Sequence, residues 1–427
     1  MGCCDDPSLR PPPAGRELSR RAFVARSAGL ALTVYGAGAL GSFDLGIAQA
    51  APSERILVSV FLEGGADTLA LLYPAGDPLY AKLRPHIALT GGTPFTEDPR
   101  LMWHPSLAPI AQLHDEGKVS VMPAIGYDHP DQSHFTSRHF WEVGATNAGL
   151  STGWLGRYLD RVGVADNPLQ GVSLGGPLQP SLATSRVPVA AIDGPGQYDF
   201  WTQGVWDKVE SRMLDTLGAF GTLRGDPAVY QVASVAAQAD RLRKQLLPFA
   251  GKTIASAVPY PKVDDDFPKQ LQGIAAMIGA GLPMRVVALQ ASGEYDTHAG
   301  QAQPLATALD TTAQSLLAFQ RDLEARNVAD RVLTLVWSEF GRRAQENGSA
   351  GTDHGAAGAA FLIGARAAGK MVGEFPGLKS GLDGDGNLRP TADFRGVYAS
   401  LLEHWLRYDA AAVVPEAGKF RRPTLVR

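Results

Sequence analysis

The chain of 427 residues is close to charge balance, with 39 Lys and Arg residues against 43 Asp and Glu residues. It has no block of basic residues, which argues against nucleic acid as its main partner. Apolar residues make up 45% of the chain, as in a soluble globular protein. Both cysteines, Cys3 and Cys4, lie at the extreme N-terminus, so we expect no disulfide, thiolate catalysis or cysteine-bound zinc in the mature protein.

The N-terminal segment has the form of a twin-arginine export signal. Residues 19–24 read Ser-Arg-Arg-Ala-Phe-Val, a weakly apolar stretch follows over 27–47, and residues 48–50 offer a small-residue cleavage site. A membrane-spanning helix is the alternative, but Asp44 and several glycines interrupt the stretch. We therefore expect residues 1–50 to be a signal peptide read by the Tat export machinery. The mature domain would then occupy the periplasm or the exterior without stable membrane insertion.

The first half of the mature chain alternates strand and helix signals. Residues 56–62 are almost continuously apolar, as in a strand buried on both faces, and they lead into a glycine turn that carries Asp67. A shorter strand is predicted over 119–123. The loop 128–132 then precedes a predicted helix that begins at Ser133, a favourable N-cap residue.

The second half continues this alternation after a different middle region. Residues from about 150 to 275 are rich in Gly and Pro at first and contain one predicted helix, so we interpret them as a cap or insertion over the core. A helix with one apolar face is predicted to begin at Pro304. The expected fold is an α/β domain over residues 51–427, with helices on both faces of one largely parallel sheet. Its predicted strands are residues 56–62, 284–290, 331–337 and 359–363.

Carboxylate and histidine side chains gather where the predicted strands end or begin. Asp296 and His298 follow one apolar run, Glu339 follows the next, and His354 lies just before the last. In open α/β sheets, ligands bind outside the carboxyl ends of the strands. Oxygen and imidazole ligands suit Zn²⁺, Mn²⁺ and Ca²⁺, so the pattern predicts a divalent metal site at one edge of one sheet.

This order of motifs resembles the alkaline phosphatase and sulfatase-like superfamily. In that superfamily a first strand ends in a metal-binding Asp, a nucleophile follows at a helix N-terminus, and further Asp and His ligands lie at later strand ends. The matching positions in this chain are Asp67, Ser133 as nucleophile, Asp296 with His298, Glu339 and His354. More narrowly, the chain resembles a Tat-exported bacterial family of unknown function, a sulfatase-like DUF family, over nearly its whole length.

The resemblance implies two metal positions. The first would take Asp296, His298 and His354, and the second would take Asp67, Glu339 and the oxygen of Ser133. The second departs from the superfamily, because Glu339 replaces an aspartate and Phe340 stands in place of a histidine. We therefore expect one well-formed ion site and a weaker or missing second one.

Other residues near the predicted site have two possible roles. Arg342 could supply positive charge for catalysis, or it could simply pair with Glu339. Asp353, His134 and His129 could contact the substrate or orient the metal ligands. Ser133 is at least a helix cap.

Two functions from different classes follow. The first is an exported metal-dependent hydrolase of phosphate or sulfate esters, acting on an anionic small molecule or a glycan ester. The alternative is a non-catalytic cell-envelope binding protein that keeps the fold.

Overall fold

The computed structural model describes residues 34–35, 55–195, 207–219, 227–250 and 254–427. The predicted signal peptide therefore lies outside the described residues, except for Val34–Tyr35, which form the short edge strand β1. Within the described ranges, no helix has both the length and the apolar character needed to cross a bilayer.

The centre of the molecule is a mixed and mostly parallel sheet. Its strands follow the order β1-β8-β7-β9-β2-β10-β13-β6-β14, so the chain crosses over repeatedly between neighbours. β13 runs antiparallel to both of its neighbours, whereas β8, β7, β9, β2 and β10 run parallel. The strands besides β1 are Ile56–Phe61 (β2), Val119–Gly126 (β6), Gly171–Leu174 (β7), Val189–Ile192 (β8), Val286–Gln290 (β9), Val332–Trp337 (β10), Gly358–Ile363 (β13) and Ala392–Asp393 (β14).

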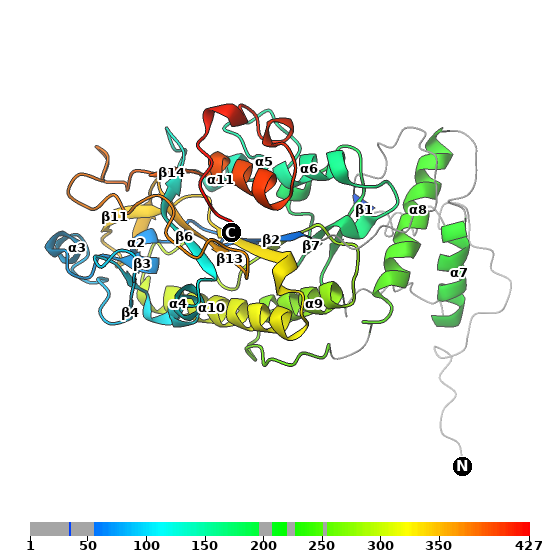
Figure 1. The fold of residues 1–427 in the computed structure, drawn as a ribbon, viewed down its shortest axis with the longest axis horizontal. Helices are drawn as coiled ribbons and strands as arrows, with labels where there is room; N and C mark the ends of the chain where they lie inside the picture. Colours follow the sequence, from blue (N-terminus) through cyan, green and yellow to red (C-terminus); the bar gives the residue numbers. More distant parts are fainter. Residues whose placement is uncertain (1–33, 36–54, 196–206, 220–226, 251–253) are drawn as a thin grey trace, which may run out of the picture.

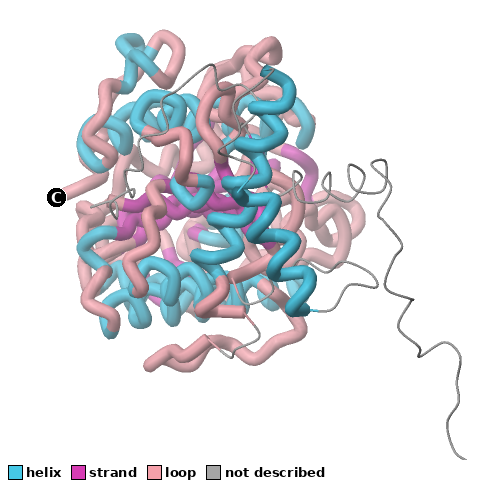
Figure 2. Tube along the Cα trace, turned by 90° about the vertical axis from the view of Figure 1, so that its right-hand side faces the viewer, coloured by secondary structure: helices cyan, strands magenta, loops and turns pink. Residues whose placement is uncertain are grey.

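Helices cover both faces of this sheet, as Figures 1 and 2 show. One face carries α4 (Ala108–Asp115), α9 (Phe267–Gly279) and α10 (Ala302–Ala325). The other carries α5 (His134–Val143), α6 (Trp154–Val162) and α11 (Phe394–Ser400), which a π-helical turn, Leu401–Trp405, continues. The predicted α/β architecture is therefore confirmed.

Alternation along the strands explains why both faces are covered. In β2, Val58 and Val60 belong to the apolar cluster under α9 and α10, whereas Leu57 and Phe61 belong to the cluster on the opposite face. Successive strand side chains point to opposite faces, so a continuously apolar strand needs helices on both. The expectation that residues 56–62 form a central buried strand is thus correct.

The interpretation of residues 150–275 as a cap needs correction. β7 and β8 belong to the central sheet, and α6 packs on one of its faces, so most of this region is part of the core. The helical pair α7 (Asp207–Ala219) and α8 (Pro227–Leu246) lies at one end of the molecule (Figure 1). The Gly- and Pro-rich composition reflects short strands joined by turns, including the 3₁₀ turns Pro168–Gln170 and Pro180–Leu182.

The remaining elements are short and lie around the sheet. Two small sheets contain β3 (Leu72–Tyr73), β4 (Thr93–Pro94) and β5 (Met102–Trp103), and β11 (Arg342–Glu346) with β12 (Thr352–His354). The short helices are α2 (Thr68–Leu71) and α3 (Pro78–Leu83), with 3₁₀ turns at Pro105–Leu107, Ala329–Arg331, Ala410–Ala412 and Ala417–Lys419. The β11–β12 hairpin brings His354 back to the edge of the main sheet.

Candidate metal centre

Three side chains from distant parts of the chain meet at the carboxyl edge of the parallel strands. His134 is the first residue of α5, Asp296 follows β9, and His354 ends β12. One ligand atom from each, two imidazole nitrogens and a carboxylate oxygen, lies within 4.8 Å of the other two. This spacing lets the three atoms share one metal ion.

His134 is oriented by Glu339. Its Nδ1 lies 2.7 Å from Glu339 Oε1, and the carboxylate also accepts hydrogen bonds of 3.0 Å from the backbone N–H groups of Gly64 and Gly65. The Glu339 hydrogen bond raises the pKa of His134 against the opposing effect of burial. In the neutral ring, a carboxylate that accepts at Nδ1 leaves the lone pair on Nε2. This buried Nε2 lies 3.5 Å from Asp296 Oδ2 and makes no hydrogen bond among the described residues.

His354 is oriented in the same way by a backbone carbonyl. Its Nδ1 donates to the carbonyl oxygen of Gln132 at 2.8 Å, which leaves Nε2 as the acceptor nitrogen of the neutral ring. Burial lowers the pKa of His354, which favours the neutral imidazole that a metal requires. Both histidines turn Nε2 toward Asp296, at 3.5 Å from its Oδ2 for His134 and 3.4 Å from its Oδ1 for His354. The residues present fit a divalent ion.

Asp296 supplies the negative charge of the group. Its Oδ1 accepts a hydrogen bond from the guanidinium of Arg342 and lies 3.0 Å from His298 Nε2. Although burial acts to raise the pKa of Asp296, Arg342 and the neighbouring histidines outweigh it, and the pKa falls below its usual value. The carboxylate therefore stays ionised at neutral pH.

His298 lies beside the three-residue group and is more exposed. Its Nε2 lies 2.9 Å from the Nε2 of His354, and its Nδ1 lies 3.5 Å from a carboxylate oxygen of Asp353. Its side chain is 44% exposed, against 23% for His354. His298 therefore lies at the solvent side of the three-residue group, and Asp353 contacts its other ring nitrogen.

Arg342 is a structural brace rather than a free cation. Its guanidinium is fully buried and donates to the carbonyl oxygens of Gly64, Gly65 and Thr352 as well as to Asp296. These bonds tie β11 to the turn after β2. Because its donors are already engaged, the predicted catalytic contact with a substrate would require Arg342 to give up some of these bonds.

The residues proposed for a second ion are not assembled into a second group. Asp67 is completely buried, and its two oxygens accept from Arg84 at 2.6 and 2.9 Å and from Gln301 at 2.5 Å. Glu339 is engaged by His134 and two backbone amides, and Ser133 Oγ accepts from the Thr136 N–H as helix cap. The sequence predicted Glu339 as a ligand and His134 as a supporting residue. In the structure His134 belongs to the candidate metal group, and Glu339 contacts its Nδ1.

His129 shows no contact with the group among the described residues. It is exposed and has a positive φ of 54° in the loop before α5. The sequence analysis missed Gln132, whose contribution is a backbone carbonyl and leaves no residue-type signal. It also missed Arg84 and Gln301, whose contacts with Asp67 arise only in the folded chain.

The Phe340 ring packs against the imidazole rings of His134 and His354. Its ring centroid lies 4.9 Å from that of His134 and 4.8 Å from that of His354. The backbone of Gly65 approaches the ring closely, because a Cβ added there would lie 2.2 Å from Phe340 Cε2. Phe340 therefore packs against both imidazoles.

Gly65→Ala should consequently both destabilise the protein and disturb the site. Gly65 has a φ of +71°, at which alanine costs about 1–2 kcal/mol, and the new methyl group would also displace the Phe340 ring. Gly377→Ala is the matched control, since Gly377 has a φ of +77° and open space at the Cβ position. Denaturant unfolding and metal titration should show a larger loss for Gly65→Ala, and equal losses would contradict the proposed role of Phe340.

The molecule is thus an α/β protein with a His–Asp–His group at the carboxyl edge of its sheet. Residues 105–387 match the family described as "Protein of unknown function (DUF1501)", and this stretch contains all three residues of the group. Because the match spans more than half of the chain, the protein belongs to this family. No curated protein matches the sequence significantly.

Several solved structures are similar in overall architecture. One is a protein in the alkaline phosphatase superfamily from Vibrio parahaemolyticus, with 9% identity and a TM-score of 0.35 over 93% of this chain and 78% of that chain. Another is the C-terminal periplasmic domain of EcEptC from Escherichia coli in complex with Zn, with 9% identity and a TM-score of 0.38 over 86% and 88%. A third is the soluble domain of lipooligosaccharide phosphoethanolamine transferase A from Neisseria meningitidis, with 9% identity and a TM-score of 0.34 over 90% and 96%. These scores mark a distant similarity.

Proposed function

We propose that this protein is an exported, metal-dependent hydrolase of phosphate or sulfate esters that works with one divalent ion. The observation that carries the proposal is the convergence of two Nε2 atoms and one carboxylate oxygen within 4.8 Å of one another. Each imidazole is fixed by a hydrogen bond at its other nitrogen, an arrangement typical of metal ligands. The part-exposed position of the group gives an ester access to it.

An ion held here would polarise an ester oxygen and offset the negative charge that develops on it. The residues around it have separate roles in this proposal. Asp296 and the two histidines bind the ion, Glu339 and the Gln132 carbonyl hold the imidazole orientations, and Phe340 keeps water from their lower side. The positive end of the α5 helix dipole also favours an anionic group beside His134.

Metal content and hydrolysis test this function together. Protein purified from its export route should carry about one equivalent of Zn²⁺, Mn²⁺ or Ca²⁺, and a chelator should lower its melting temperature. The metal-loaded protein should hydrolyse at least one substrate in a panel of phosphate monoesters, diesters and sulfate esters.

A reporter fused to residues 1–50 should reach the periplasm only when the Tat machinery is present.

A non-catalytic binding role is the second candidate. It is favoured by the commitment of Asp67, Glu339 and Arg342 to internal contacts, which leaves a single ion with no second cation to stabilise a leaving oxygen. A protein that binds an anionic ligand in a metal-dependent manner, yet hydrolyses none of the panel, would fit this role.

Ser133→Ala separates the two possible roles of that serine. If Ser133 is the nucleophile, turnover should fall by at least about a thousandfold while metal binding persists. If it serves only as the cap of α5, the loss should be about 1 kcal/mol of stability with turnover intact. Single-turnover kinetics on the best substrate of the panel, with metal titration beside it, distinguish these results.

A further inference from the structure

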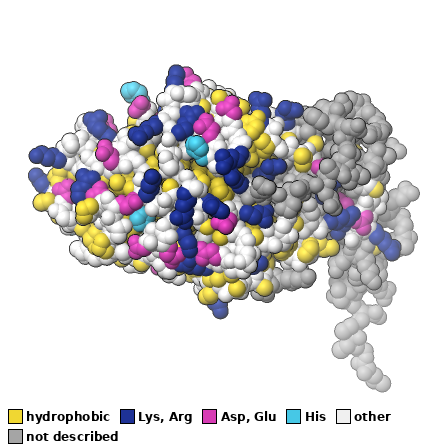
Figure 3. Space-filling model, in the orientation of Figure 1, with side chains coloured by type: hydrophobic (Ala, Val, Ile, Leu, Met, Phe, Trp, Pro, Cys, Tyr) yellow, Lys and Arg dark blue, Asp and Glu magenta, His cyan; other side chains and the backbone are white. Residues whose placement is uncertain are grey.

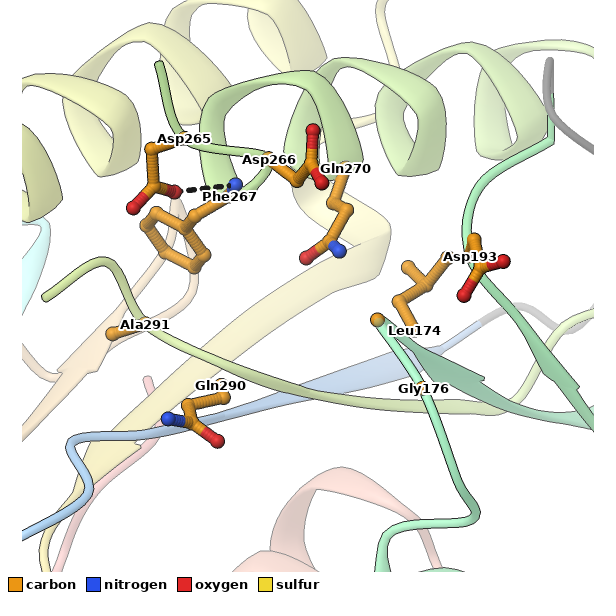
Figure 4. Close-up of a pocket in the computed structure, with 10 residues that line it drawn as sticks. Leu174, Gly176, Asp193, Asp265, Asp266, Phe267, Gln270, Gln290 and Ala291 are labelled. Carbon is orange, nitrogen blue, oxygen red and sulfur yellow. Dashed lines mark hydrogen bonds between the residues drawn. The ribbon is translucent and has the colours of Figure 1, made fainter. Parts of the chain in front are cut away.

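A second polar hollow lies at the same edge of the sheet as the metal group. It occupies about 700 Å³ between the carboxyl ends of β7, β8 and β9 and the N-terminus of α9 (Figure 4). This volume is in the range of small-molecule sites, and the position follows the rule for ligands in open α/β sheets. The lining residues include Asp193, Asp265, Asp266, Phe267, Gln270 and Gln290.

The charges around this pocket disfavour an anion. Asp193, Asp265 and Asp266 are three of its lining residues, and Lys269 pairs with only one of them, at 3.0 Å from Asp266. Asp265 and Asp266 also stand at the positive end of α9, where their charge offsets the helix dipole. The site would therefore repel a phosphate or sulfate group that the N-terminus of a helix would otherwise attract.

Directional hydrogen-bonding groups point into the space. Gln270 is 8% exposed, and its amide faces the pocket in Figure 4. Gln290 donates to Glu63 at 2.6 Å and keeps its carbonyl oxygen as an acceptor. Amides both donate and accept, as hydroxyl groups do. These groups suit a ligand with several hydroxyls.

Phe267 gives the pocket one apolar wall. Its ring projects from the start of α9 toward the space in Figure 4, beside Ala291. Phe267 is only 2% exposed and packs in the apolar core, so contacts with a ligand would come mainly from the amides and carboxylates. These groups can donate to and accept from the hydroxyls of an uncharged sugar, whereas a simple amine would use the carboxylates alone.

A chain of contacts connects the pocket with the metal group. Gln290 contacts Glu63, whose other oxygen accepts from Arg138 at 2.7 Å. Arg138 lies one helical turn after His134 on α5, so the two side chains are neighbours on one face of the helix. The pocket and the ion site are thus adjacent along the sheet edge, with Glu63 and Arg138 between them.

We propose that this pocket binds an uncharged, hydroxyl-rich sugar unit. Resting on the proposed function, we further infer that this unit belongs to the substrate, whose single ester group lies at the metal. The pocket would select glycan esters that are neutral apart from that ester, since further anionic groups meet Asp193, Asp265 and Asp266.

Saccharide binding to the full mature protein tests this proposal without reference to turnover. Saturation-transfer NMR with glucose, galactose, mannose, N-acetylglucosamine and their β-linked disaccharides should detect binding with and without a chelator. Gln270→Leu keeps the volume and removes the amide, so it should weaken that binding by about tenfold. Gln303→Leu, at an exposed position of α10, is the matched control and should leave binding unchanged.

A second variant covers the case in which Gln270→Leu fails to fold. Asp193→Asn, at an exposed position, should let glucose 6-sulfate bind, which wild type should reject. The proposal is overturned if no neutral saccharide binds, if Gln270→Leu binds as well as wild type, or if ethanolamine binds in preference to the sugars. Saccharide binding without any hydrolysis would retain the sugar site and reject the proposed function alone.

Discussion

His354→Ala should remove the bound metal while most of the fold remains. Wild type should hold about one equivalent of ion through His134, Asp296 and His354, and a set reduced to two of these side chains is too weak to retain it. The fold should survive because His354 is only part-buried and lies on a hairpin at the sheet edge. Elemental analysis and calorimetric titration measure the loss, and circular dichroism checks the fold.

His404→Ala is the control for this experiment, because His404 is an exposed histidine away from the site. It should keep the metal content of wild type. The metal-site proposal fails if wild type is metal-free and its melting temperature changes neither with a chelator nor with added metal. It also fails if His354→Ala retains a full equivalent of ion.

Arg84→Ala should cause a large loss of stability. Arg84 and Asp67 are both completely buried, and Arg84 also donates to the carbonyl oxygens of Arg343 and Ala344. Removal of one partner leaves an uncompensated buried charge, which typically costs about 3–5 kcal/mol. Chemical denaturation should measure this loss directly.

The exposed pair of Arg366 and Asp330 gives the matched comparison. Their side chains are 51% and 70% exposed, so solvent screens the pair and Arg366→Ala should cost less than about 1 kcal/mol. Asp67→Asn adds a second readout, since it should destabilise the protein yet leave the metal content unchanged. A loss of metal with normal stability would instead restore Asp67 as a ligand.

Residues of both signs are interspersed on the face of the molecule seen in Figure 3. This agrees with the nearly balanced composition, and it places no large field of one sign there. The negative charge on which the proposed sugar selectivity depends is confined to the pocket at the start of α9. Local charge of this kind depends on which loops meet and is not visible in the net charge.

The strands that carry the site were predictable because burial on both faces forces a nearly continuous apolar run. Residues 56–62 and 331–337 show such runs, and they pair in parallel at the centre of the sheet. The helix after Ser133 and the helix near 304–325 were also predictable, from an N-cap residue and from 3.6-residue periodicity. The direction of β13 was not, since an apolar run is the same in either direction and the β11–β12 hairpin decides it.

Sequence alone thus determined that acidic residues and histidines follow buried strands, because local pattern and turn chemistry are written in adjacent residues. Only the tertiary structure decided their roles. Glu339 became the orienting partner of His134 because α5 places the imidazole 2.7 Å from it, although 205 positions separate the two. Asp67 became half of a buried ion pair because α3 delivers Arg84 to it. The role of a carboxylate depends on which donors lie beside it in the folded protein. These donors come from distant parts of the chain, so a local sequence pattern does not reveal them.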